Sequence, residues 1–139
     1  MLFASALVAL GCDHGSTSDQ ADLKNAMAAD LATSRALKQA DDAAHDGRST
    51  EAADLLKRVA APAADEGVST ASAVTPRTAW GRTEKDALVV LVSDRKREME
   101  AYEHALRAGS DEEKLAALTK QIDIERRASA LAEEIERGP

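Results

Sequence analysis

The chain has 139 residues, enough for one domain with a modest hydrophobic core. Its net charge of −7 argues against non-specific nucleic-acid binding, which needs a basic face, and a 2% share of aromatic residues argues against stacking platforms for bases or sugars. Abundant alanine, with few glycines, prolines and β-branched residues, predicts an all-α protein.

Residues 1–11 form an apolar segment that ends at the single cysteine of the chain, Cys12. An apolar run of this length suits a secretory signal, which needs about 7–15 apolar residues, and is too short to span a membrane, which takes about 20. The composition becomes polar directly after Cys12. We therefore expect residues 1–11 to be a cleaved signal peptide and residues 12–18 to be a flexible tether.

The pair Gly11-Cys12 resembles the end of the lipobox of bacterial lipoproteins. Two residues depart from that pattern: Ala9 stands where leucine is most common, and Leu10 stands where a small residue is usual. The opening Met1-Leu2-Phe3 also lacks the Lys or Arg of a typical signal. The resemblance implies cleavage between Gly11 and Cys12, a diacylglyceryl group on the Cys12 thiol, and acylation of the new amino terminus.

This covalent lipid is the one cofactor we expect. A buried methylene contributes about 0.8 kcal/mol, so two or three acyl chains would hold the protein at the inner or outer membrane of a bacterial envelope. The alternative is an unlipidated cytoplasmic helical protein in which Cys12 is an ordinary small core residue.

Residues 19–61 predict an antiparallel helical hairpin. Apolar residues recur at helical spacing from about residue 19 to residue 44, and Asp46-Gly47 breaks the pattern. A second helix is predicted from Thr50 to Ala61, with Pro62 ending it.

Residues 62–82 lack a helical stripe and are rich in Gly, Ser, Thr and Pro, which predicts a flexible linker. Trp80 lies near the end of this segment. We expect its ring to cover the edge of the core; the alternative is that it anchors a partner.

Residues 83–137 predict a second hairpin. Thr83 and Asp86 resemble a capping box for a helix that runs to about residue 108. Gly109 is placed to end that helix, and Ser110 with Glu113 forms the clearest capping box in the chain. The two hairpins together predict a three- or four-helix bundle with coiled-coil-like packing.

The apolar seam of the helix over residues 83–108 contains a charge. Its members alternate at spacings of four and three: Leu88, Val92, Arg95, Met99, Tyr102 and Leu106. At the level of Arg95, a partner helix must supply an acid or an opening to water. A pocket near Arg95, Tyr102 and Trp80 that binds a small anion is therefore an alternative function.

No pattern in the sequence indicates catalysis. His14, His45 and His104 lack the i,i+4 spacing of a helical zinc site, and no Gly-rich phosphate loop or nucleophile with a partner base is present. We expect a non-enzymatic protein without a metal. Its expected role is that of a membrane-anchored interaction or scaffolding module, whose helices bind a protein partner or a second copy.

Overall fold

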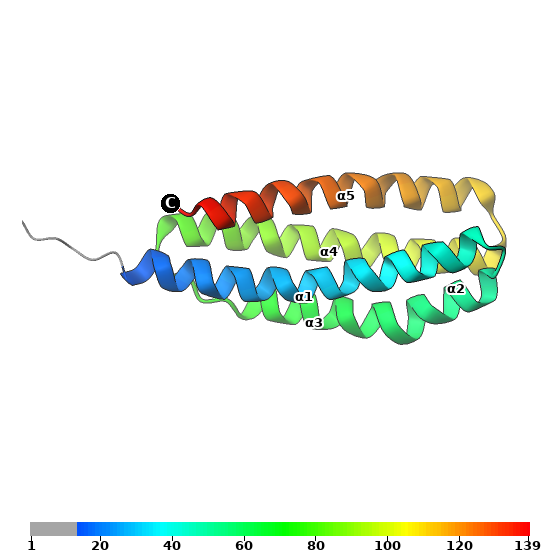
Figure 1. Ribbon diagram of the computed structural model, residues 1–139, viewed down its shortest axis with the longest axis horizontal. Helices are drawn as coiled ribbons and strands as arrows, with labels where there is room; N and C mark the ends of the chain where they lie inside the picture. The colour runs from blue at the N-terminus through cyan, green and yellow to red at the C-terminus, as the bar shows by residue number, and fades with distance from the viewer. Residues whose placement is uncertain (1–13) are drawn as a thin grey trace, which may run out of the picture.

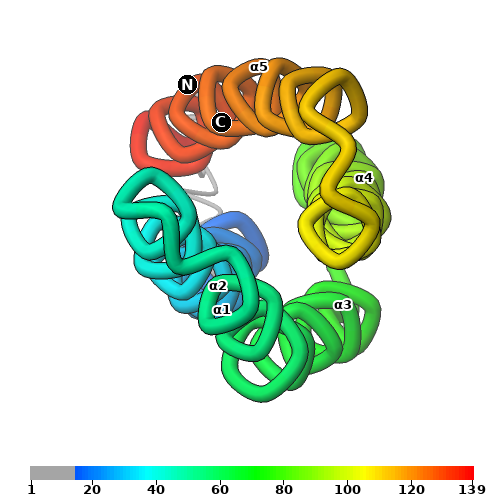
Figure 2. The backbone as a smooth tube through the Cα atoms, turned by 90° about the vertical axis from the view of Figure 1, so that its right-hand side faces the viewer, coloured from blue at the N-terminus to red at the C-terminus, as the bar shows by residue number. Residues whose placement is uncertain are grey.

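The structure, a computed structural model, describes residues 14–139, and this part of the chain is all-α (Figure 1). It contains α1 (His14–His45), α2 (Ser49–Leu55), the π-helical segment η1 (Leu56–Ala60), α3 (Ala61–Ala73), α4 (Ala79–Ala108) and α5 (Asp111–Arg137). The segments α2, η1 and α3 follow one another directly and form one rod. Figure 2 shows that this rod, α1, α4 and α5 surround a common axis, so the predicted helical bundle is confirmed.

The first helix begins earlier than the sequence predicted. Helix α1 starts at His14, so residues 14–18 of the expected tether are helical, and Ser16 and Asp19 are buried. The predicted signal peptide, with Gly11 and Cys12, lies outside the described residues. The turn after α1 was predicted correctly, since Gly47 there has a φ of 80°, in the left-handed region that favours glycine.

The predicted flexible linker over residues 62–82 is wrong. Most of it is helical in α3 and in the first turn of α4, and only residues 74–78 connect the two helices. The buried face of α3 consists of small residues, Ala64, Gly67 and Ala71, at spacings of three and four. A Cβ built on Gly67 would lie 3.9 Å from the Cα of Asp30, so the backbones of α3 and α1 approach closely. The prediction failed because a helix face made of such small residues does not give the pattern of large apolar residues that indicates a buried helix.

The sequence predicted that Pro62 ends the second helix, but the helical rod continues past this proline. Proline removes one backbone donor and crowds the carbonyl four residues earlier, which normally breaks an α-helix. Here the five residues of η1, Leu56–Ala60, adopt the wider π form directly before Ala61-Pro62. A π turn of this kind lets the rod continue past the proline.

Helix α4 begins at a different cap from the one predicted. Its N-cap is Thr78, whose hydroxyl accepts a hydrogen bond from the Gly81 N–H at 2.9 Å, whereas the Thr83 hydroxyl donates to the Ala79 carbonyl. The boundary between α4 and α5 is as predicted. Gly109 has a φ of 70°, and the Ser110 hydroxyl caps α5 by accepting from the Glu113 N–H.

Asp19 of α1 ties the start of the bundle to the connection between α3 and α4. Its carboxylate accepts hydrogen bonds from the N–H groups of Arg77 and Thr78, both at 2.9 Å, and from the Thr78 hydroxyl at 2.6 Å. Burial raises the pKa of the Asp19 carboxyl, but these hydrogen bonds outweigh burial and leave the pKa below its ordinary value. Gly81 makes room for this carboxylate, because a Cβ there would lie 2.2 Å from an Asp19 oxygen.

The core consists of two apolar clusters. One lies towards the α1–α2 and α4–α5 turns and includes Leu37, Leu56, Met99 and Tyr102 with many alanines. The other lies towards the opposite end; its largest members are Leu23, Leu88, Leu91, Ile124, Leu131 and Ile135. The buried alanines fill the space between the helices of the bundle.

Asp19→Ala should lower the free energy of unfolding by about 2 kcal/mol at pH 7, because three donors lose a charged acceptor. The folded-state pKa is lowered, so this stabilisation is present above the unfolded pKa of about 3.9 and is lost as pH falls through the folded value. Denaturant unfolding of both proteins between pH 7 and pH 2 measures the difference, which should shrink only below about pH 4.

A matched double-mutant cycle uses Gly81→Ala. In the natural chain the added methyl collides with the Asp19 carboxylate and should cost about 1–3 kcal/mol. In the Asp19→Ala background the cost should fall markedly. Simple additivity of the two substitutions would contradict the proposed contact.

Candidate functional site

Arg95 of α4 lies at the centre of the bundle and bonds to acids from two other helices. Its Nε and Nη2 donate to the two carboxylate oxygens of Asp30 on α1, at 2.7 and 2.9 Å, and its Nη1 donates to Glu125 on α5. Arg95 is 1% exposed and Asp30 is also buried. The expectation that a partner helix supplies an acid at this level is confirmed.

These carboxylates keep Arg95 charged inside the protein. Burial lowers the pKa of Arg95, but the hydrogen bonds and charges of Asp30 and Glu125 outweigh burial and raise it above its ordinary value. Because its guanidinium is already paired with two acids, this arrangement does not favour binding of a further anion.

The three residues that the sequence suggested for a pocket do not form one site. Trp80 is partly buried against the cluster that contains Leu23 and Leu88, as expected for a ring at the edge of the core. Tyr102 follows it by 22 residues on the same helix, a distance of about 33 Å. Tyr102 instead packs with Leu37 and Met99 in the other cluster.

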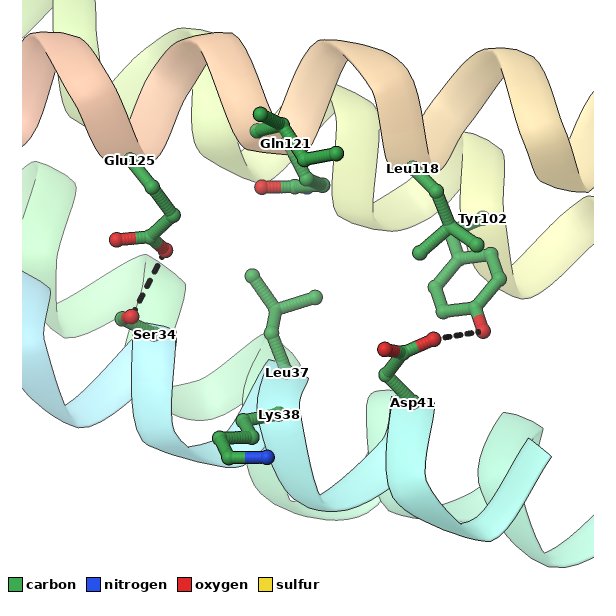
Figure 3. Close-up of a pocket in the computed structure, with 9 residues that line it drawn as sticks. Ser34, Leu37, Lys38, Asp41, Tyr102, Leu118, Gln121 and Glu125 are labelled. Carbon is green, nitrogen blue, oxygen red and sulfur yellow. Dashed lines mark hydrogen bonds between the residues drawn. The ribbon is translucent and has the colours of Figure 1, made fainter. Parts of the chain in front are cut away.

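A groove runs between α1 and α5 on the described part of the chain. Its widest part has a volume of about 480 Å³ and is lined by Ser34, Leu37, Lys38, Asp41, Tyr102, Leu118, Gln121, Ile122 and Glu125. Figure 3 shows the α5 side chains facing those of α1 across this space. Two adjoining hollows share lining residues with it and extend it towards Lys24 at one end and His45 at the other. We call this feature the α1–α5 groove.

Polar bridges cross between α1 and α5 at only part of the length of the groove. Near one end the Gln20 amide donates to the Ile135 and Glu136 carbonyls, at 2.7 and 3.0 Å. At the middle Ser34 donates to Glu125 at 2.8 Å. Beyond Ser34, towards the α4–α5 turn, no side-chain hydrogen bond or ion pair joins α1 to α5 in the described structure, and there the groove has its largest volume.

The outer rim of the groove carries apolar side chains of α5. Leu115 is 67% exposed, Ile122 is 72% exposed, and the partly buried Leu118 lies between them. Another row of α5 side chains is buried in the bundle: Ala117, Ile124, Ala128, Leu131 and Ile135. Leu115 and Ile122 therefore lie outside the core, whereas Leu118 packs against its edge.

Gln121 lies beneath this rim and lacks hydrogen-bond partners. It is 8% exposed, and neither its side-chain nitrogen nor its oxygen bonds to any group in the described structure. Figure 3 shows its side chain directed from α5 into the space between the helices. An unpaired buried amide costs about 1–3 kcal/mol, so it is ready to accept a ligand that supplies both a donor and an acceptor. The sequence carried no signal for this residue.

Tyr102 and Asp41 form the polar wall of the groove near the α4–α5 turn. The Tyr102 hydroxyl donates to an Asp41 carboxylate oxygen at 3.1 Å. Burial, and then the neighbouring charge of Asp41, raise the pKa of the Tyr102 phenol above its ordinary value. Tyr102 therefore stays a neutral donor and holds Asp41 at the side of the groove.

Two features are absent from the part of the chain that the structure describes. No group of three or more His, Cys, Asp and Glu side chains is placed to hold a metal ion. None of the described helices is both long and apolar enough to cross a bilayer.

Comparison of the chain with protein-family models, with curated proteins and with solved structures gave no match.

Asp30→Ala should lower the free energy of unfolding by about 3–5 kcal/mol, because it leaves a buried guanidinium with one acid in place of two. Urea unfolding followed by circular dichroism measures the loss. The control is Asp30→Leu combined with Arg95→Met, which removes both buried charges and should recover most of the stability. A cost below 1 kcal/mol for Asp30→Ala would contradict a buried, charged pair.

Gln121→Leu should raise the free energy of unfolding by about 1 kcal/mol, because it removes an unpaired buried amide and adds apolar contact. Gln121→Glu, of nearly the same shape, should lower it because a carboxylate is placed in the same site. The melting temperatures of the two variants and the natural chain give the comparison. If the leucine variant melts lower, the Gln121 amide has a partner in the free protein.

Proposed function

We propose that this protein is a non-catalytic interaction module of a bacterial envelope, anchored by lipid on Cys12, whose α1–α5 groove receives a helix. The observation that carries this proposal is the combination of an exposed apolar rim, Leu115 and Ile122, with the buried, unpaired amide of Gln121 beneath it. A partner lying in the groove would cover the apolar rim and form hydrogen bonds with the Gln121 amide.

The shape of the groove supports a helical partner. Its lining on α1 extends from Lys24 to His45, which corresponds to about 32 Å along the helix axis. Two helices form its walls, and Leu115, Leu118 and Ile122 have the spacing with which one helix packs on another. A helix of about 20 residues would fill this length.

The chemistry of the groove supports binding over catalysis. Asp41 accepts a hydrogen bond from Tyr102, and Glu125 is bonded to Arg95 and Ser34, so both carboxylates serve contacts within the protein. A general acid or base would have to give up one of these contacts to reach a substrate.

A second candidate function is binding of a small apolar molecule with an amide-like group. The volume of about 480 Å³ at the widest part of the groove lies within the usual range for ligand sites, and Gln121 offers a donor and an acceptor there. The anion-binding version of this idea has less support, since Arg95 is paired with Asp30 and Glu125.

The membrane anchor rests on the sequence around Cys12. Cys12 precedes the first residue of α1 by two positions, so a lipid on its thiol would hold the start of α1 close to the bilayer. The groove would then run along the side of the bundle and stay open to the aqueous phase.

The intact mass of the protein extracted from bacterial membranes should be that of residues 12–139 plus the diacylglyceryl group and the acyl chain of the new amino terminus. Cys12→Ser should keep residues 1–11, gain no lipid mass and leave the membrane fraction. The natural chain recovered with its leader and without lipid would contradict the anchor. That result would leave the helix-binding groove to be tested separately.

A further inference from the structure

We propose that the helix received at the α1–α5 groove is α5 of a second copy of this chain. The two α5 helices pack antiparallel about a two-fold axis that passes near Leu118. This proposal rests on the proposed function, because it names the partner of the same surface.

The apolar rim is self-complementary in this arrangement. Leu115 and Ile122 lie at equal distances on either side of the midpoint between Leu118 and Thr119. In an antiparallel pair centred there, Leu115 of each copy lies level with Ile122 of the other. Both side chains are more than half exposed in the single chain, so the pairing buries the largest exposed apolar side chains of α5.

The charges at the two ends of the rim select the antiparallel arrangement. Glu112 precedes Leu115 by three residues, and Arg126 follows Ile122 by four. In the antiparallel pair, Glu112 of one copy lies within one residue of the level of Arg126 of the other, and symmetry produces this attraction twice. A parallel pair would place Glu112 against Glu112 and Arg126 against Arg126, which repel.

Both charged side chains are accessible for this contact. Arg126 is bonded within its own copy only to the neighbouring Asp123, and its side chain is strongly exposed. Glu112 is exposed in the first turn of α5, where Asp111 is the residue that pairs with Lys114. Glu125 is directly level with Glu112 of the other copy, a like-charge contact that Arg95 weakens only in part because Arg95 also pairs with Asp30.

The test uses the full chain in bacterial membranes, with a single reporter thiol at Thr119→Cys, beside the proposed axis. Under mild oxidation we expect a disulfide-linked dimer. Glu112→Arg or Arg126→Glu, each added to the reporter, should lower the dimer yield about tenfold, because two attractions become two repulsions. The double reversal should restore the yield, which no loss of folding would do.

Two controls accompany the reporter. Val90→Cys places a thiol at a 55% exposed position on α4, away from the groove, and should give no dimer. The chain without a reporter thiol shows how much disulfide-linked dimer Cys12 alone produces. Direction is tested by mixing differently tagged copies: Leu115→Cys should link to Ile122→Cys of the other copy and not to a second Leu115→Cys.

The outcomes separate this inference from the proposed function. A photoreactive maleimide on the Thr119→Cys thiol should give a product of twice the mass of the chain. A product containing a different protein, without the dimer, would overturn self-pairing while leaving the groove as a docking site. No cross-linked product at all would contradict both, and a dimer insensitive to the charge reversals would overturn the proposed register.

Discussion

The structure depends most on a charge held inside an otherwise apolar bundle. Arg95 lies between the two core clusters and bonds to Asp30 on α1 and Glu125 on α5, so one side chain connects three helices. Apolar side chains tolerate small sliding of one helix along another, but a buried guanidinium does not, because a shift leaves its donors unpaired. Arg95 thus fixes the register of α1, α4 and α5.

The contacts of Arg95 and of its partner Glu125 also explain why the α1–α5 groove has its largest volume towards the α4–α5 turn. Gln20 joins α1 to the end of α5, and Glu125, held by Arg95, bonds to Ser34 near the middle. Beyond that level the two helices share the space around Leu37, Leu118 and Gln121. The surface proposed for docking is therefore the part of the α1–α5 boundary that intramolecular polar contacts leave unfilled.

The sequence predicted the features that depend on large or strongly directing residues. The all-α class, the Ser110 cap, the Gly109 end and the need for an acid near Arg95 followed from local chemistry. The wrong predictions concern helices that pack through small residues and helix ends that are fixed by contacts with residues far away in the sequence. Helix α3 packs through Ala64, Gly67 and Ala71, and the start of α4 is set by Asp19, which is 59 residues earlier than Thr78. The unpaired Gln121 could not be predicted either, because its isolation depends on where α1 lies.

The ends of the bundle have a consequence for how paired copies would sit at a bilayer. The start of α1 and the end of α5 lie together, joined by the contact of Gln20 with Ile135 (Figure 1). Ile135 is 17 residues from Leu118, about 25 Å, so an antiparallel pair would point the two ends at which we propose a lipid anchor in opposite directions, about 50 Å apart. Such a pair would either lie flat along one membrane surface or act as a spacer between two facing membranes.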